Sequence, residues 1–284
     1  MPKYFVDEIK GQAFRLEGDV AHHLKRVLRV RPGEKIILCN GKAMDFYCII
    51  EDTEPLTLVV ENYKESKTEL PYKITLYQAM PKSDKLEWII QKSVELGVHS
   101  IVPVYTEHSV VRYKSQSQNK NGGNTKTARY QKIAEAAAGQ SMRGIIPKVY
   151  LPMPWEEAFE MAMAYKAAGG LIIAAHEKEQ KQTIKSVLNT GGNPHFINTT
   201  ASNSIALNNS ISLDTISSNI TISSKGFNEI GLWIGPEGGF SEKEIEVMEK
   251  SGFKLVSLGP RILRAETAAI AALAQITLMI ENGV

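Results

Sequence analysis

The chain has 284 residues, 43% of them hydrophobic, and a formal net charge of +2 at pH 7. This length allows one large domain or two smaller ones, and the small net charge means that only a local cluster of cations could indicate nucleic-acid binding. Cys39 and Cys48 have no CxxC spacing, so reduced thiols are expected rather than a disulfide or a metal site. The sequence shows no apolar signal segment and no apolar run of spanning length, so we expect a soluble cytoplasmic protein without membrane contact.

Residues 1–70 are predicted to form a small, mostly β domain. Its β-rich runs span residues 36–38, 44–50 and 56–60. Asn40-Gly41 between the first two runs is a strong hairpin signal, because both residues tolerate positive φ. The charged segment 62–70, which ends before Pro71, is interpreted as the linker to a second domain.

A helix is expected over residues 21–30, within a strongly basic segment. Residues 22–31 contain four cations and two histidines but no acid. Such a cluster can neutralise phosphates along a nucleic-acid backbone, although a solvated helix face is the alternative explanation. The candidate RNA-binding residues are His22, Lys25, Arg26, Arg29 and Arg31.

Residues 71–284 alternate between strand and helix patterns, which predicts an α/β domain with a parallel sheet covered by helices. Strands are expected at 73–79, 100–105 and 170–175. Helices are expected after a Ser83-Asp84 cap, at 128–139 and at 155–166. The polar residues 116–127 predict a loop, and residues 189–228, rich in Ser, Asn and Thr, are interpreted as an insertion.

The C-terminal part of the chain contains the clearest indication of a ligand site. Two apolar runs, 230–234 and 253–258, each end in a turn that begins Gly-Pro. They predict parallel strands, and ligands of such sheets bind outside the carboxyl ends of the strands. Ser241 and Glu244 form a capping box, which predicts a helix that starts directly after the Gly-rich turn 235–239.

The Gly-rich turn lets its backbone approach a ligand closely. It contains neither GxxxxGK[ST] nor GxGxxG, and the acidic side chain of Glu237 argues against a bound phosphate. An adenosine ligand with a positively charged sulfonium suits this turn better, because backbone groups can read the adenine edge and no anion is required. A purely structural turn is the alternative.

A second polar junction follows, where Arg261, Arg264 and Glu266 lie at a loop-to-helix boundary. Arginine can hold a phosphate through two hydrogen bonds, and an anion near a helix start is stabilised. Ordinary capping with an ion pair is the alternative. The Ala-rich helix that follows is apolar all round, which predicts burial against the sheet or a second subunit.

The two C-terminal motifs resemble those of a known protein family. IGPEGGFSEKE followed by LGPRILRAETA resembles the C-terminal signature of the SPOUT-class (trefoil-knot) methyltransferases, and within them the RsmE-type 16S rRNA uridine-N3 methyltransferase family. Residues 78–112 and 132–149 are similar to the middle of that family, and HHLKRVLRVRPGE is similar to its PUA-like RNA-binding domain. The resemblance covers nearly the whole chain except residues 189–228.

The resemblance implies S-adenosylmethionine as methyl donor, 16S rRNA of the small ribosomal subunit as partner, a homodimer, and no metal. It also implies a PUA-like β-barrel domain over residues 1–70 and a knotted SPOUT-type methyltransferase domain over 71–284. Three turns would hold the cofactor. Their residues are Ala175, His176, Glu177, Ile234, Gly235, Pro236, Glu237, Gly238, Leu258, Gly259, Arg261, Ile262, Leu263, Thr267 and Ala268.

Uridine N3 becomes nucleophilic when its proton is lost, so the reaction needs a proton acceptor and stabilisation of the uracil oxyanion. We expect Glu266 to accept or orient the proton, and Arg264 and Arg143 to stabilise the oxyanion or hold flanking phosphates. Arg143 is expected at an exposed helix end next to Gly144. An ion pair at a domain or dimer interface is the alternative for each of the three.

Three other functions compete with this interpretation. The nearest is a SPOUT methyltransferase that acts on a tRNA base or a ribose 2′-hydroxyl, because the motifs constrain the cofactor more tightly than the target. A non-catalytic RNA-binding module is disfavoured by the intact Gly235, Gly238 and Arg264. A nucleotide-phosphate enzyme is disfavoured by the missing Lys-Ser/Thr after the Gly-rich turn. The six histidines have no metal-ligand spacing.

Overall fold

The computed structural model describes residues 1–82, 85–110, 122–190 and 229–282. The expected Ser83-Asp84 cap lies outside the described residues, and so does the insertion expected over 189–228, apart from residues 189–190. Those two residues end a helix, so the insertion begins later than expected.

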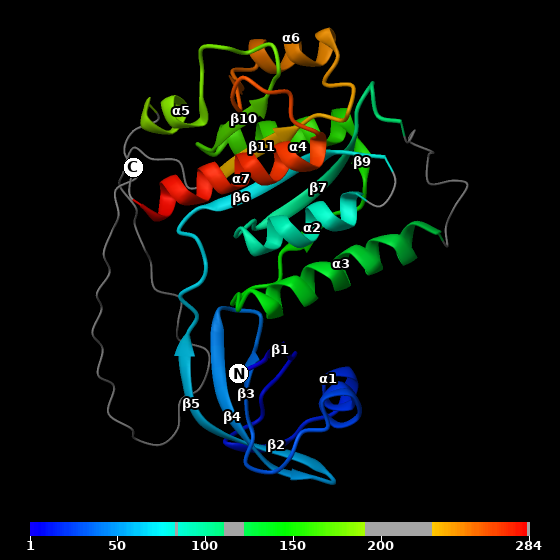
Figure 1. Ribbon diagram of the computed structural model, residues 1–284, viewed down its shortest axis with the longest axis vertical. Coiled ribbons are helices and arrows are strands. Elements are labelled where there is room, and N and C mark those ends of the chain that lie inside the picture. Colours follow the sequence, from blue (N-terminus) through cyan, green and yellow to red (C-terminus); the bar gives the residue numbers. More distant parts are fainter. Residues whose placement is uncertain (83–84, 111–121, 191–228, 283–284) are drawn as a thin grey trace.

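The N-terminal part is built on a five-stranded sheet with the order β1-β3-β4-β5-β2 (Figure 1). Its strands are β1 (Lys3–Phe5), β2 (Ala13–Arg15), β3 (Lys35–Cys39), β4 (Met44–Thr53) and β5 (Leu56–Glu65). The mostly β prediction is therefore confirmed. The linker prediction is wrong over residues 62–65, because these residues pair with β4, with Glu65 opposite Met44.

The predicted basic helix is two short pieces, α1 (Gly18–His23) and the π-helical turn η1 (Leu24–Leu28). Arg29 ends η1 in the left-handed conformation, with φ of 52°. Leu24 is fully buried in the N-terminal core, whereas Val27 is 63% exposed. Because Leu24 faces the core and Val27 faces solvent, the basic residues next to Val27 also face solvent.

The C-terminal part is built on a parallel sheet with the order β12-β10-β11-β6-β7-β8, and β9 pairs with β7. Its strands are β6 (Lys73–Ala79), β7 (Ser100–Tyr105), β8 (Lys148–Val149), β9 (Met153–Pro154), β10 (Leu171–Ala175), β11 (Glu229–Ile234) and β12 (Lys254–Val256). The parallel α/β prediction is confirmed. The knot is not tested by the strand order and stays a prediction.

Helices cover both faces of this sheet (Figure 1). They are α2 (Lys85–Glu95), α3 (Gly122–Gln140), α4 (Trp155–Ala167), α5 (Ile184–Thr190), α6 (Glu242–Lys250) and α7 (Ala265–Glu281). Neighbouring strand residues alternate between the faces: Leu232 joins the core under α2, α3, α5 and α7, whereas Trp233 joins the core under α4 and α6. The loop predicted over 116–127 is wrong from residue 122 onward, where α3 has already begun.

The strands that matter for the site are neighbours in the sheet. β10 lies between β12 and β11, and all three run in the same direction. Their carboxyl ends therefore meet at one edge, and α7 begins beside that edge after the turn that follows β12 (Figure 1).

Candidate functional site

The turns after β10, β11 and β12 line one cavity of about 460 Å³. Every predicted cofactor residue lines this cavity except Thr267, which is exposed on α7. Phe240, Ser257 and Pro260, which the sequence did not single out, also line it. The three turns that were predicted to act together are therefore brought together by neighbouring parallel strands.

The Gly-rich turn after β11 is held by the helix that follows it. The capping box is present: the backbone N–H of Ser241 donates to Glu244 Oε2 at 2.8 Å, and the backbone N–H of Glu244 donates to Ser241 Oγ at 3.3 Å. Gly239 has φ of +70°, and a Cβ there would lie 2.9 Å from Glu177 Oε1. The turn therefore needs glycine for its backbone angle, whereas the Glu177 side chain could move to relieve the contact.

His176, in the turn after β10, lines the cavity and can form a hydrogen bond to a ligand. Its backbone N–H donates to the carbonyl oxygen of Val256 at 3.0 Å, which fixes its position between β10 and β12. Its side chain is 11% exposed, and Nδ1 is 3.8 Å from Glu177 Oε2, too far for a hydrogen bond. Nδ1 is buried and has no hydrogen-bond partner among the described residues. A polar atom left in this state favours a ligand that supplies the missing bond.

The turn after β12 carries exposed cations. Gly259 has φ of +117°, and the turn ends at Arg264, the N-cap residue of α7. Arg264 lines the cavity and is exposed, with no side-chain bond to the helix end. Ile262 lines the same cavity and is 89% exposed. This side of the cavity therefore offers a guanidinium and an apolar surface to an incoming molecule.

Glu266 does not line the cavity. Its Oε2 lies 3.1 Å from Lys85 Nζ, and the same nitrogen lies 3.1 Å from Glu237 Oε1 in the Gly-rich turn. The carboxylates of Glu266 and Glu237, which lie beside the Lys85 ammonium, raise the pKa of Lys85. Burial opposes the ionisation of Glu237, but bonds from its own backbone N–H, the Lys82 N–H and Lys85 outweigh burial and lower its pKa. Sequence reasoning missed Lys85, because no local pattern marks it.

Arg143 is placed differently from the expectation. The predicted exposed helix end is wrong: Arg143 is 2% exposed and does not line the cavity. Its guanidinium donates to both carboxylate oxygens of Glu69 and to the carbonyl oxygens of Val94 and Val98. All of its nitrogens are engaged inside the chain, so a role in holding RNA or uracil has no support here.

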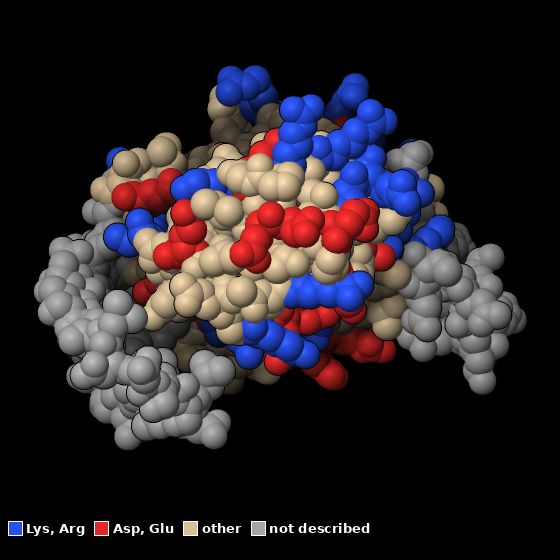
Figure 2. Space-filling model, turned by 90° about the horizontal axis from the view of Figure 1, so that it is seen from below, with Lys and Arg blue, Asp and Glu red and all other residues tan. Residues whose placement is uncertain are grey.

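The candidate RNA-binding residues lie close together, but they differ in exposure and in ion pairing. His22, Arg26, Arg29 and Arg31 are exposed. The Nζ of Lys25, by contrast, lies 2.7 Å from Glu54 Oε1. Figure 2, a view from the N-terminal side, shows Lys and Arg gathered over part of the face and an acidic band beside them. A polyanion would therefore contact a limited basic surface rather than the whole face.

Comparison with known proteins agrees with this arrangement. A family model described as RNA methyltransferase domain matches residues 68–277, and one described as RNA methyltransferase PUA domain matches residues 16–61. The chain belongs to the RNA methyltransferase family. The resemblance seen in the sequence is confirmed at this level.

Relatives of this RNA methyltransferase match along almost all of the chain. "Ribosomal RNA small subunit methyltransferase E" from Bacillus subtilis is 28% identical over 288 residues, covering 99% of this chain and 98% of that protein. The protein of that name from Synechocystis is 30% identical, covering 92% of this chain and 71% of that protein. The crystal structure of the Neisseria gonorrhoeae protein of that name, bound to S-adenosyl methionine, matches with a TM-score of 0.70 and 27% identity, covering 98% of both chains.

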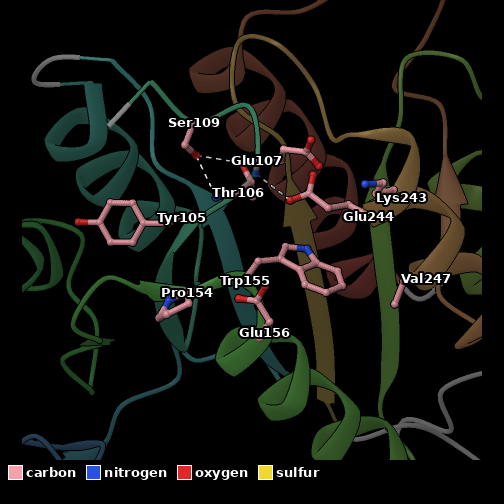
Figure 3. A pocket seen from close by; sticks show the side chains of 10 residues that line it. All are labelled: Tyr105, Thr106, Glu107, Ser109, Pro154, Trp155, Glu156, Lys243, Glu244 and Val247. Carbon is pink, nitrogen blue, oxygen red and sulfur yellow. Dashed lines mark hydrogen bonds between the residues drawn. The ribbon is translucent and has the colours of Figure 1, made fainter. Parts of the chain in front are cut away.

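The RNA methyltransferase has a second cavity of about 600 Å³ at the end of β7, lined also by residues of α4 and α6. Figure 3 shows Glu107 and Glu244 above the indole of Trp155. The backbone N–H of Glu107 donates to Glu244 Oε1 at 3.0 Å. Its charged lining residues are Glu107, Glu156, Glu244 and Lys243, so the cavity is mainly acidic and disfavours phosphate. The cavity formed by the three turns is the better candidate site.

The described residues contain neither a membrane-spanning helix nor a metal-binding cluster. None of the described helices is long and apolar enough to cross a membrane. The described part of the chain also contains no cluster of three His, Cys, Asp or Glu side chains able to hold a metal ion. Cys39 and Cys48 are free and buried, and burial raises the pKa of each thiol to about 11.

Proposed function

We propose that this RNA methyltransferase transfers the methyl group of S-adenosylmethionine to N3 of a uridine in 16S rRNA of the small ribosomal subunit. The observation that carries the proposal is the convergence of three separate turns on one cavity, in a chain whose relatives are named small-subunit rRNA methyltransferases. A neighbour of the same fold was solved with this cofactor bound.

The residues present suit S-adenosylmethionine. The cavity of about 460 Å³ has the size of a small-molecule site. The turns at 175–177 and 235–239 would hold the adenosine through backbone groups, and the orphaned Nδ1 of His176 offers one further hydrogen bond. When bound, the cofactor supplies a methyl group on a positively charged sulfonium, ready for transfer to a nucleophile.

The remaining charged groups of the site would act on the uracil. As the N3–H bond breaks, negative charge would spread over N3 and the uracil oxygens. That charge would be consumed when N3 takes the methyl group and the bond between the methyl carbon and the sulfonium sulfur breaks. Arg264, exposed at the cavity, would stabilise that charge or hold a flanking phosphate. Glu266, in the first turn of α7, would accept or orient the N3 proton.

The decisive experiment is methylation of small ribosomal subunits from a strain that lacks the modification, followed by digestion and mass spectrometry. The expected product is N3-methyluridine in 16S rRNA. Arg264→Ala and Glu266→Ala should each lower the rate about 100-fold or more, and cofactor binding should persist in Arg264→Ala. Methylated tRNA or a 2′-O-methylated ribose would replace the proposed target, and full activity of both variants would overturn the assigned roles.

We also propose that the chain divides into an RNA-binding domain, residues 1–70, and a methyltransferase domain, residues 71–284. The exposed basic residues Arg26 and Arg29 support an RNA contact by the first domain. Arg26→Ala and Arg29→Ala should each reduce the slope of log affinity against log salt by roughly 0.7 per lost phosphate contact. Cofactor affinity should not change. Lys35→Ala, which removes an exposed cation on β3 that pairs with Glu61 on β5, is the control.

A homodimer in the cytoplasm completes the proposal. Leu278 on α7 is 60% exposed and Ile262 before α7 is 89% exposed, so both apolar side chains are available for coverage by a second copy. Sedimentation equilibrium checks the oligomeric state. A monomer at concentrations where the enzyme is active would contradict the dimer.

A further inference from the structure

Lys85 connects three parts of the site that are far apart in the sequence. It is the first residue of α2, and its Nζ lies 3.1 Å from Glu237 Oε1 in the Gly-rich turn. The same nitrogen lies 3.1 Å from Glu266 Oε2 in the first turn of α7. The backbone N–H of Lys82, just before α2, also donates to Glu237 Oε1, at 3.2 Å.

Lys85, Glu237 and Glu266 form one charge cluster rather than two separate ion pairs. One ammonium group lies between two carboxylates whose side chains are only 24% and 17% exposed. Without the ammonium, two partly buried anions would face each other with no cation between them, and they would repel. Because Glu237 belongs to the Gly-rich turn and Glu266 to the start of α7, just after the turn that follows β12, the ammonium ties the Gly-rich turn to the start of α7.

We propose that Lys85 is a positioning residue, which holds the Gly-rich turn and the start of α7 in the relative position that cofactor binding requires. This inference rests on the proposed function, because it concerns the same cofactor cavity. It also changes what is expected of Glu266. A carboxylate already bonded to an ammonium is better placed to orient a proton than to accept one freely.

Two simpler roles compete with positioning. Lys85 could be an ordinary surface cation, since exposed ion pairs contribute only ~0–1 kcal/mol to stability. Its side chain is 32% exposed, so it could also contact an RNA phosphate. The three roles differ in which measured quantity a substitution changes: cofactor affinity for positioning, RNA affinity for a phosphate contact, and neither for a surface cation.

The test compares Lys85→Met, Lys85→Arg and the wild type by calorimetric titration with S-adenosylhomocysteine, alongside thermal unfolding and the KM for small subunits. Lys85→Met should weaken cofactor affinity about tenfold, and Lys85→Arg should restore part of the loss because it keeps a cation. Lys92→Met is the matched control: Lys92 lies on the same helix, is 35% exposed and pairs with Glu95. It should leave the affinity unchanged.

A double-mutant cycle with Glu237→Gln sharpens the test. If Lys85 acts through Glu237, the double variant should lose little more cofactor affinity than Lys85→Met alone. Unchanged affinity in Lys85→Met, a change in KM for RNA only, or strict additivity in the cycle would overturn the proposal. If Lys85→Met does not fold, the affinity of Lys85→Arg decides, and a value equal to that of Lys92→Met overturns it. A wild type that binds no cofactor would instead overturn the proposed function.

Discussion

Arg143 and Lys85 each join distant segments of the chain, but their partners differ in kind. Arg143 is 2% exposed and donates to Glu69 and to two backbone carbonyl oxygens. Lys85 is 32% exposed and pairs with Glu237 in the Gly-rich turn and with Glu266 at the start of α7, next to the candidate site. The first cation holds the segment before β6 against the ends of α2 and α3, whereas the second holds parts of the site.

The difference between their partners distinguishes a cation that stabilises the fold from one that positions residues of a binding site. A guanidinium has five N–H donors in a fixed plane, and Arg143 directs four of them at groups that belong to the scaffold. Because Arg143 is also only 2% exposed, its guanidinium is not accessible to a substrate. An ammonium is a point charge, and Lys85 places that charge between Glu237 and Glu266 at the edge of a cavity. The identity of the partners, not the strength of the bonds, distinguishes the two roles.

The largest effect is expected for Arg143→Ala. Removing the guanidinium leaves the partly buried Glu69 carboxylate without its countercharge, although the N–H groups of Gly144 and Ile145 still donate to its Oε1. The loss of the cation should cost about 3–5 kcal/mol of unfolding free energy. Urea denaturation followed by circular dichroism measures the loss. Arg143→Lys should lose somewhat less, because it keeps the charge but not the planar fork. If Arg143→Ala kept its stability but lost methyl transfer, Arg143 would belong to the site and the comparison would fail.

A smaller effect is expected at the capping box beside the Gly-rich turn. Ser241→Ala removes the oxygen that accepts the Glu244 N–H at 3.3 Å, which should cost about 1 kcal/mol of unfolding free energy. The same substitution loosens the start of α6, so cofactor affinity should fall by a few-fold as well. Ser241→Asp, which keeps a capping oxygen, should restore both quantities. Equal loss in the two variants would show that the cap does not position the turn.

The sequence predicted most of the site because its information there is local. Apolar runs that end in glycine turns predict parallel strands, and parallel strands place their following turns at one edge. The capping box at Ser241 and Glu244 was predicted from two residues three positions apart and is present. The three turns therefore line one cavity, as expected.

What the sequence did not predict depends on contacts between distant residues. Glu69 is 74 residues from Arg143, inside the segment interpreted as a linker, so its carboxylate gave no reason to expect burial. Glu237 is 152 residues from Lys85. No spacing rule connects residues this far apart, and only the packed sheet brings them together.

Two errors in the secondary structure have the same origin. Residues 122–127 are rich in Gly, Asn and Thr, which have low helix propensity, yet they form the start of α3, which packs on α2. Residues 62–65 are polar and exposed, so they lack the alternation of a half-buried strand, yet they pair with β4. In both cases an element continues beyond the residues whose local pattern predicts it: β5 through its pairing with β4, and α3 by beginning before residue 128.

The smallest effect is expected for Arg129→Ala, which completes the comparison. Arg129 Nη2 donates to Glu87 Oε2 at 2.8 Å, so this pair ties α3 to α2 only two residues beyond Lys85. The Arg129 side chain is 67% exposed, so the pair should contribute only ~0–1 kcal/mol to stability. Cofactor affinity should not change, because neither residue contacts a cavity turn. If Arg129→Ala weakened cofactor binding as much as Lys85→Met, then any contact that holds α2 in place would support cofactor binding. The particular position of the Lys85 ammonium would then not matter.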